Sequence, residues 1–351
     1  MKVKIGDLTK IKTGKLDANA SSEDGQYPFF TCSKEPLKIS TYSYDCECVL
    51  VAGNGDLNVK YYNGKFDAYQ RTYIIENNSD GKLYMPYLYL FMEEYVEELR
   101  RQAIGGVIKY IKLGNLTDAM IELPSVEEQR NIVKILFKAK QILEQREIEL
   151  EKLDELIKAR FVEMFGNPDV NEKNWNVYKM EQLCEVGSSK RIYQNDQSLT
   201  GIPFLRISDL VNRMDTGSKD CDLFIPEELF EKFKKQGLVP ARGDILLTAR
   251  GTLGRCYIIQ DDDEFYFQDG MITWLSKFDE KITPLYISYL FEMPEFRKQI
   301  DSLQAGSTVA YLSISMTKEL NVMVPPLELQ NQFAAFVAQT DKSKFDIHKF
   351  L

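Results

Sequence analysis

The strongest constraint on this 351-residue chain is that its sequence repeats itself. Five segments of the first half recur in the same order in the second half, which chance does not readily produce. The pairs are KIGDL (4–8) with KMEQL (179–183), VLVAGNGDL (49–57) with ILLTARGTL (245–253), YQ (69–70) with FQ (267–268), QAIGGVIKY (102–110) with QAGSTVAY (304–311), and IELPSVEEQ (121–129) with VMVPPLELQ (322–330). The chain is therefore expected to fold as two copies of one unit.

The spacing between matching segments shows where the copies differ. It is 175 residues at Lys4 and Lys179 but 201 residues from Tyr110 and Tyr311 onward, so the second copy is longer by 26 residues. Most of the extra length falls between about residues 190 and 245. We therefore expect an additional segment inside the second globular part.

Each copy ends in a helix with a heptad pattern, which is typical of a coiled coil. A capping box formed by Ser125 and Glu128 opens the first helix, and Gly166 ends it. The second helix follows Pro325 and Pro326, and by the 201-residue spacing it is about 15 residues shorter and looks truncated. The expected seam positions are Leu136, Leu143, Leu150, Leu153, Ile157 and Met164 in the first helix and Phe333, Val337 and Ile347 in the second.

The globular parts alternate short apolar runs with turn signals, which predicts strands at 27–31, 48–52, 60–62 and 70–75. Hairpin-type turns are expected at 53–55 and 63–64, and helices at 86–101 and 284–291. The predicted fold class is α+β, with two tandem α/β-mixed domains separated by long coiled-coil helices and related by an approximate two-fold. The expected segments are a first domain 1–123, a central spacer helix 124–166, a second domain 167–324 and a C-terminal spacer helix 325–351.

Composition narrows the class of protein. The sequence shows no signal peptide and no apolar stretch of membrane-spanning length, so we expect a cytoplasmic protein. Its six cysteines are scattered, and His348 is its single histidine, so no metal site is expected. The net charge is −9, so a nucleic-acid surface would need its positive charge gathered on one face or a partner that contacts phosphates.

Catalytic patterns are missing from the sequence. It contains no Asn/Asp-Pro-Pro-aromatic motif of adenine methyltransferases and no phosphate-binding loop of ATPases, and a histidine base is not expected. The acidic run 261–264 is expected to be a solvated turn rather than a metal cluster. Two alternatives remain open, a metal-dependent nuclease and a scaffold that uses only its coiled coil.

The order and duplication of these segments resemble the specificity subunit of Type I restriction-modification systems. The resemblance rests on two units that each end in (Leu/Val)-Pro-x-x-x-x-Gln and a heptad helix, on the opening segments at 4–8 and 179–183, and on LRISD (205–209), GDILLT (243–248) and GTLG (251–254). It covers essentially the whole chain. The short final helix departs from the family pattern.

The resemblance implies a non-catalytic subunit in which each domain reads one half of a split double-stranded DNA target. The helices would set the gap between the halves and dock two methyltransferase subunits, and restriction subunits would join the full complex. S-adenosylmethionine for adenine N6 methylation, and ATP and Mg²⁺ for restriction, are expected in those partners, with no cofactor in this chain.

Candidate DNA-contacting residues are polar and basic side chains in matching loops of the two copies. Arg and Lys suit guanine, Asn and Gln suit adenine, and Ser and Thr suit either base. The matching loops carry different residues, Asn54 in one copy and Arg250 in the other, as two half-sites of different sequence would require. The candidates are Asn54, Asn58, Lys60, Gln70, Arg71, Lys109 and Tyr110 in the first copy and Lys190, Arg191, Arg206, Arg250, Thr252, Arg255, Gln268, Ser307, Thr308 and Tyr311 in the second.

Overall fold

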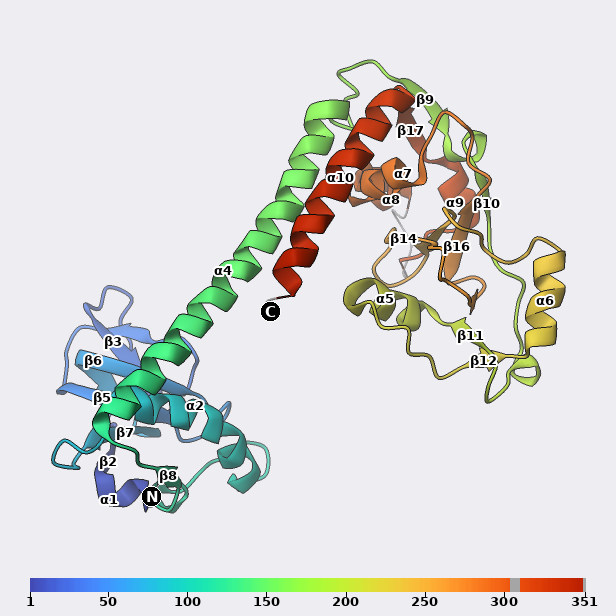
Figure 1. Ribbon diagram of the computed structural model, residues 1–351. Helices are drawn as coiled ribbons and strands as arrows, with labels where there is room; N and C mark the ends of the chain where they lie inside the picture. Colours follow the sequence, from blue (N-terminus) through green and yellow to red (C-terminus); the bar gives the residue numbers. More distant parts are fainter. Residues whose placement is uncertain (304–309, 350–351) are drawn as a thin grey trace. The chain divides into compact units, whose positions relative to one another are not determined.

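The computed structural model describes residues 1–303 and 310–349, and the chain forms two compact units, Met1–Gln145 and Arg146–Leu351 (Figure 1). The boundary between the units falls within one continuous helix, α4 (Val126–Phe165). Each unit has its own hydrophobic clusters, and no cluster shares residues with the other unit. Each unit therefore has a core of its own.

Unit 1 is built on a mixed six-stranded sheet of order β2-β7-β5-β6-β3-β4. All neighbouring strands are antiparallel except β3 and β6. The strands are β2 (Thr9–Thr13), β3 (Tyr27–Phe30), β4 (Leu37–Ile39), β5 (Tyr44–Ala52), β6 (Val59–Ala68) and β7 (Thr72–Asn77), with a separate pair β1 (Lys2–Lys4) and β8 (Met120–Glu122) and helices α1 (Ile5–Leu8), α2 (Met85–Gln102) and α3 (Leu113–Thr117). One face of α2 is buried with Val49 and Val51 of β5 in a shared core.

One predicted turn of unit 1 is wrong. Asn63 and Gly64 lie inside the ten-residue strand β6, where Asn63 pairs with Glu47 and Gly64 with Cys46 of β5. Asn-Gly is a strong hairpin signal only when the flanking runs pair with each other. Here both flanks pair with β5, so the continuous ladder overrides the local turn preference. The turn at 53–55 does form, within the loop that joins β5 to β6.

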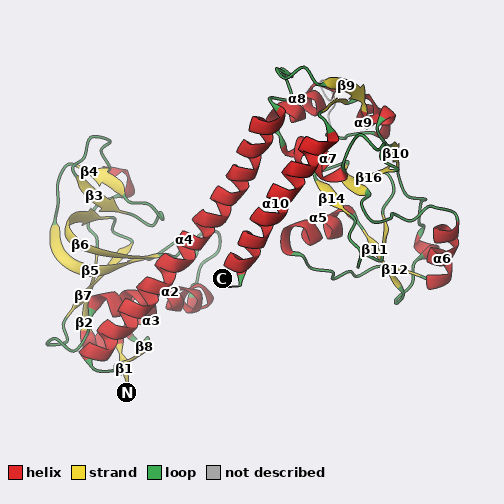
Figure 2. Cartoon of the chain, turned by 45° about the horizontal axis from the view of Figure 1, so that its top comes forward, coloured by secondary structure: helices red, strands yellow, loops and turns green. Residues whose placement is uncertain are grey.

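Unit 2 repeats this order of strands with one strand interrupted (Figure 2). Its sheets run β10-β16-β13-β14 and β15-β11-β12, which correspond in order to β2-β7-β5-β6 and β6-β3-β4. The strands are β9 (Asn176–Lys179), β10 (Glu185–Gly187), β11 (Ile202–Leu205), β12 (Phe224–Ile225), β13 (Ile245–Thr248), β14 (Cys256–Ile258), β15 (Tyr266–Phe267), β16 (Ile272–Ser276) and β17 (Asn321–Val324). The single parallel pair also recurs, since β11 pairs with β15 as β3 pairs with β6.

The extra residues of unit 2 form two helices. Its helices are α5 (Ile207–Thr216), α6 (Glu227–Lys235), α7 (Pro284–Glu292), α8 (Pro294–Leu303), α9 (Ile314–Glu319) and α10 (Leu327–His348). Of these, α5 and α6 occupy the predicted insertion. Phe230 and Phe233 of α6 are buried against Tyr266, so the insertion carries a small core of its own.

The acidic run 261–264, which interrupts the strand between β14 and β15, is only partly solvated. The Asp263 side chain is 1% exposed, pairs with Arg213 at 3.4 Å and accepts hydrogen bonds from the Tyr257 hydroxyl and the Gln260 backbone N–H. The expectation of a wholly solvated turn is therefore wrong at Asp263. A buried carboxylate persists here because a cation and two donors compensate its lost hydration.

The helix ends follow the sequence signals. The Ser125 backbone N–H donates to the Glu128 carboxylate at 2.8 Å, and the Glu128 N–H donates to Ser125 Oγ at 3.3 Å, which completes the capping box. Gly166 adopts φ +83° and its N–H donates to the Val162 carbonyl, as expected of a glycine helix terminus.

Within unit 2 the end of α4 packs antiparallel against α10. Phe161 and Phe165 contact Phe333 with ring centroids 5.5 and 5.4 Å apart, while Asp154, further back along α4, pairs with Lys344, further on along α10. Ile157, Met164, Phe333 and Val337 of the expected seam are buried here. Leu150, Leu153 and Ile347 are half-buried, whereas Leu136 and Leu143 are 44% and 41% exposed in the described structure.

The repeated glutamine braces each unit in the same way. The Gln129 side chain accepts from the Tyr84 N–H and donates to the carbonyls of Lys82 and Pro124, all within 2.8–2.9 Å. The Gln330 side chain makes the matching bonds to the Thr283 N–H and to the carbonyls of Lys281 and Pro325. The duplicated Pro-x-x-x-x-Gln segment therefore ties the start of each long helix to the loop before the helix that packs on the sheet.

Candidate nucleic-acid interface

Three loops of unit 1 meet at one end of its sheet. Asn54, in the loop 53–58 after β5, forms an antiparallel bridge with Tyr110. The Gly53 N–H donates to the Arg71 carbonyl at 2.8 Å. A β-carbon on Gly53 would lie 2.3 Å from that same carbonyl oxygen, so this close approach requires glycine. The structure thus brings together Asn54, Arg71 and Tyr110, which are far apart in sequence.

Several of these side chains are available to an external ligand. Arg71 and Lys109 are exposed, and neither makes an ion pair in the described part of the chain. Tyr110 is 38% exposed, so its ring does not belong wholly to the core. Unpaired cations beside an exposed aromatic ring suit contacts with phosphates and bases.

The other candidates of unit 1 mainly organise the loops. The Asn58 amide donates to the Cys32 carbonyl at 2.8 Å, and the Lys60 ammonium donates to the Asn58 side-chain oxygen. Burial lowers the pKa of Lys60 below its ordinary value. The Gln70 amide donates to Asp17 at 2.8 Å. These three residues therefore have protein partners already.

Unit 2 builds the same arrangement with different side chains. Arg250 forms an antiparallel bridge with Tyr311, matching that between Asn54 and Tyr110. Its guanidinium lies over the Tyr311 ring, 5.0 Å from the centroid, a cation–π geometry that holds the side chain beside an aromatic surface. The Ala249 N–H donates to the Met271 carbonyl, the counterpart of the bond from Gly53 to Arg71. Ser307 and Thr308 lie outside the described residues.

Most arginine candidates of unit 2 are neutralised by carboxylates. Three such pairs occur, Arg191 with Asp269 at 2.9 Å, Arg206 with Asp209 at 3.0 Å and Arg255 with Asp215 at 2.6 Å. Arg255 lowers the pKa of Asp215 through its hydrogen bond. By contrast, Arg250 and Lys190 have no ion pair in the described structure, and Lys190 lies 5.6 Å from the Phe233 ring centroid. Arg250 and Lys190 are thus the candidate cations of unit 2 that are free to meet an anion.

The two remaining candidates, Gln268 and Thr252, are held in place by hydrogen bonds of their backbone atoms. The Gln268 N–H donates to the Leu205 carbonyl at 2.9 Å, as the Gln70 N–H donates to the Leu16 carbonyl in unit 1. The Thr252 carbonyl accepts from the Thr248 hydroxyl at 2.5 Å, and the Thr252 side chain is exposed. The duplicated loops are therefore held in place by equivalent backbone bonds.

Sequence reasoning missed one arginine in each unit. The Arg100 guanidinium of α2 donates to the Leu57 carbonyl at 2.9 Å, and the Arg297 guanidinium of α8 donates to the Leu253 carbonyl at 2.6 Å. Leu57 and Leu253 are matching residues of the loops 53–58 and 249–254. The 197-residue spacing of the two arginines, close to that of the loops, was the available signal. The contact itself could not be predicted, because the acceptor is a backbone carbonyl and not a recognisable partner side chain.

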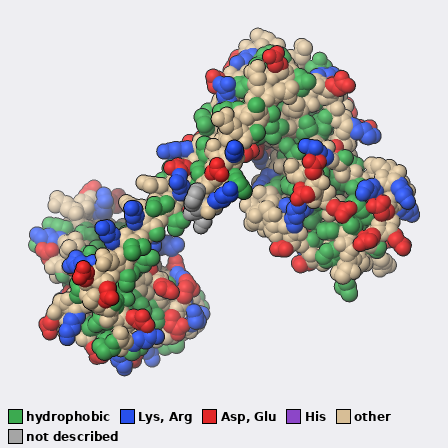
Figure 3. Space-filling view, in the orientation of Figure 1, with side chains coloured by type: hydrophobic (Ala, Val, Ile, Leu, Met, Phe, Trp, Pro, Cys, Tyr) green, Lys and Arg blue, Asp and Glu red, His purple; other side chains and the backbone are tan. Residues whose placement is uncertain are grey.

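Charge is mixed over the surface of each unit. In the face drawn in Figure 3, Lys and Arg side chains are interspersed with Asp and Glu on both units.

No group of three or more His, Cys, Asp or Glu residues in the described chain is placed to hold a metal ion. Within residues 1–303 and 310–349, no helix is long and apolar enough to cross a membrane.

Known proteins provide the comparison for this geometry. The family model described as the Type I restriction modification DNA specificity domain matches residues 1–152 and again 172–351. The chain is 40% identical over 156 residues to the EcoDI specificity subunit of Escherichia coli, which covers 44% of this chain and 34% of that protein. It is 25% identical over 328 residues to a putative specificity subunit of Haemophilus influenzae, S.HindORF215P, covering 89% and 80% of the two chains.

Solved structures share the fold. The Type I restriction-modification S subunit of M. genitalium superposes with a TM-score of 0.63 at 17% identity, covering 99% of this chain and 91% of that one. A chain from a study of complex assembly and conformational transition of the type I R-M system has a TM-score of 0.55 at 14% identity, covering 99% and 94%. Because the family model matches both units, this chain belongs to the family of Type I restriction-modification DNA specificity subunits.

Proposed function

We propose that the chain is the DNA-reading, non-catalytic subunit of a Type I restriction-modification enzyme and that each unit reads one half of a bipartite target. The observation that carries this proposal is the pair of matching bridges, Asn54 with Tyr110 and Arg250 with Tyr311. Equivalent backbone frames here present chemically different side chains. Asn suits adenine and Arg suits guanine, so the two units would read different sequences.

The long helices would set the gap between the half-sites and dock methyltransferase subunits. Support comes from apolar side chains of α4 that are exposed in the described structure, among them Leu136 and Leu143 at 44% and 41%. S-adenosylmethionine, and ATP with Mg²⁺ for restriction, would be bound by those partner subunits. The complex would act on cytoplasmic DNA.

The test is to co-express the chain with its methyltransferase subunit and map N6-methyladenine across the host genome. We expect one bipartite motif, with two short defined halves around a fixed gap. A stable complex that adds no methylation would contradict the proposal and favour a scaffold. Metal-dependent DNA cleavage by the isolated chain would favour a nuclease instead.

The assignment of Arg250 is tested by Arg250→Ala in the same assay. Loss of a bidentate contact to guanine costs about 1–3 kcal/mol of discrimination, so one position of one half-site should become degenerate. The other half-site should stay unchanged. Arg242→Ala is the matched control, because Arg242 is an exposed arginine of the same unit that pairs with Asp261. An unchanged motif in Arg250→Ala would remove Arg250 from the set of reading residues.

A further inference from the structure

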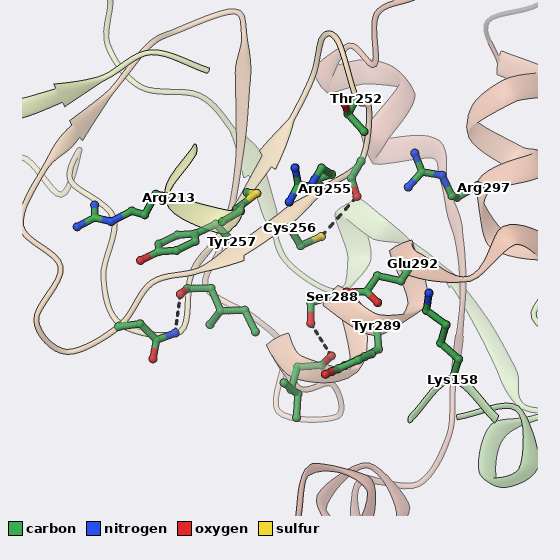
Figure 4. A pocket seen from close by; sticks show the side chains of 15 residues that line it. Lys158, Arg213, Thr252, Arg255, Cys256, Tyr257, Ser288, Tyr289, Glu292 and Arg297 are labelled. Atoms are coloured by element: carbon green, nitrogen blue, oxygen red, sulfur yellow. Dashed lines mark hydrogen bonds between the residues drawn. The ribbon is translucent and has the colours of Figure 1, made fainter. Parts of the chain in front are cut away.

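A pocket of about 660 Å³ in unit 2 is lined in part by Thr252 and Gly254 of the loop 249–254 (Figure 4). Its walls come from that loop, from β14, and from helices α4, α5, α7 and α8. Four cationic side chains line it, Lys158, Arg213, Arg255 and Arg297. The pocket therefore places a concentration of positive charge beside a candidate DNA-contacting loop.

Only part of this charge is neutralised. Arg255 pairs with Asp215 and Arg213 with Asp263, while in Figure 4 the Lys158 ammonium points toward Glu292. Arg297 donates to the Leu253 carbonyl, and no carboxylate of the described chain lies within ion-pair distance of it. Among the described residues that line the pocket, Lys158 and Arg297 make no ion pair and Glu292 is the one carboxylate, so one positive charge is left over.

The matching place in unit 1 provides an internal comparison. A smaller pocket of about 350 Å³ lies behind the loop 53–58 and is lined by Arg100, the counterpart of Arg297. Arg100 makes the same bond to the loop carbonyl but also pairs with Glu97 and with Asp56, while Glu93 pairs with Lys140. The described lining of this pocket holds two cations, Lys34 and Arg100, and two carboxylates, Glu93 and Glu97. The two copies therefore share the arginine brace and differ in whether its charge is compensated within the chain.

We propose that the pocket of unit 2 binds one backbone phosphate of the target DNA through Arg297, a contact that Arg100 does not make in unit 1. A phosphodiester carries a single negative charge, which matches the one uncompensated cation. An unpaired guanidinium in a concave site is suited to phosphate, since its fork of donors can bond two oxygens at once. The exposed Thr252 at the pocket's rim offers a further hydroxyl donor.

Among the described residues, Glu292 is the one carboxylate that lines this pocket, and its surroundings limit its repulsion of an anion. Burial raises its pKa above the ordinary value for Glu, and the charge of Lys158 partly offsets that rise. Figure 4 shows Glu292 on the Lys158 side of the pocket and the Arg297 guanidinium directed toward the loop carrying Thr252. The phosphate would therefore meet Arg297 at the loop side of the pocket, away from the carboxylate.

The proposal rests on the proposed DNA-reading function, and the salt dependence of binding tests it separately. Each phosphate contact contributes about 0.9 to the slope of log affinity against log salt concentration. With the full chain bound to its methyltransferase subunit and a duplex carrying the target, we expect Arg297→Gln to reduce this slope by about 0.9. Arg297→Lys should retain the slope, because it retains the charge.

Arg100→Gln is the matched control, because it also removes the brace on a loop. We expect it to weaken binding through the loop 53–58 while leaving the salt slope at the wild-type value. An unchanged slope in Arg297→Gln, or equal losses in the two glutamine variants, would overturn the proposal. Failure of the wild-type complex to prefer its target duplex would instead count against the proposed function.

The same pocket chemistry would also suit a free inorganic phosphate ion instead of a DNA phosphate. Thermal unfolding in inorganic phosphate, at an ionic strength matched with chloride, separates the two sources. Stabilisation of the wild type by phosphate that is lost in Arg297→Gln, together with an unchanged DNA salt slope, would assign the pocket to a free anion and overturn the DNA contact. A reduced slope in Arg297→Gln supports the DNA phosphate.

Discussion

At the scale of single residues, Asp244 shows why the Gly-Asp segment before β13 has its sequence. Gly243 adopts φ +84°, a conformation that favours glycine, and the Asp244 carboxylate accepts from the Ala241 N–H at 2.8 Å and from Trp274 Nε1 at 2.9 Å. Burial raises the pKa of Asp244 above the ordinary aspartate value, against these two hydrogen bonds. The fold thus favours the neutral form of a group that ionises more readily in the unfolded chain.

This sign leads to a pH-dependent prediction for Asp244→Asn. A carboxyl whose pKa is raised by folding stabilises the protein below its unfolded pKa and loses that contribution as the pH rises through the folded pKa. Asn keeps an acceptor oxygen for both donors and cannot ionise. We therefore expect the difference in unfolding free energy, variant minus wild type, to become more positive between about pH 4 and pH 7. Denaturant titration at each pH measures this difference.

Asp279→Asn is the control of opposite sign. The backbone and side chain of Lys281 donate to Asp279 and lower its pKa, so its ionised form stabilises the fold above the unfolded pKa and that stabilisation is lost as the pH falls. Its replacement should cost more at neutral pH than at acidic pH. Parallel pH trends in the two variants would contradict the argument for Asp244.

At the scale of elements, the glutamine brace fixes the start of each long helix. Gln330 is 1% exposed and is the partner of three backbone groups. A buried polar group left unpaired costs about 1–3 kcal/mol. Gln330→Ala should therefore lower the unfolding free energy of unit 2 by about 3 kcal/mol, measured by chemical denaturation.

Gln332→Ala provides the comparison for this variant, since Gln332 lies exposed on the same helix. Its loss should change stability by less than about 0.5 kcal/mol, as is usual for surface substitutions. Equal effects of the two variants would mean that helix propensity, and not the brace, determines the outcome.

At the scale of the whole molecule, separate cores predict two unfolding steps. Both tryptophans, Trp175 and Trp274, lie in unit 2, so tryptophan fluorescence reports that unit, whereas far-ultraviolet circular dichroism reports both. We expect the two signals to give different thermal midpoints. Gln129→Ala should move only the circular dichroism transition of unit 1, and Gln330→Ala should move the fluorescence transition. One coincident transition shifted by either variant would show that the units unfold as one.

The repeat in the sequence by itself determined the organisation of the molecule. Matching segments in the same order predicted two related units. The heptads predicted α4 and α10, and a capping box and Gly166 predicted the ends of α4, because these signals depend on periodicity and on local backbone chemistry. The predicted helices at 86–101 and 284–291 also formed, as α2 and α7. Heptads, caps and amphipathic helices are patterns of neighbouring residues, so they can be recognised in the sequence without knowing the tertiary contacts.

Only the tertiary structure decided which of the candidate side chains remain free. Arg255 and Arg191 are as basic in sequence as Arg250, but each has a carboxylate partner from a distant segment, Asp215 and Asp269, while Arg250 has Tyr311 beside it. Pairing depends on distances between segments far apart in sequence, which composition does not encode. For the same reason Asn63 lies in a strand, because pairing along all of β6 outweighs a local turn preference.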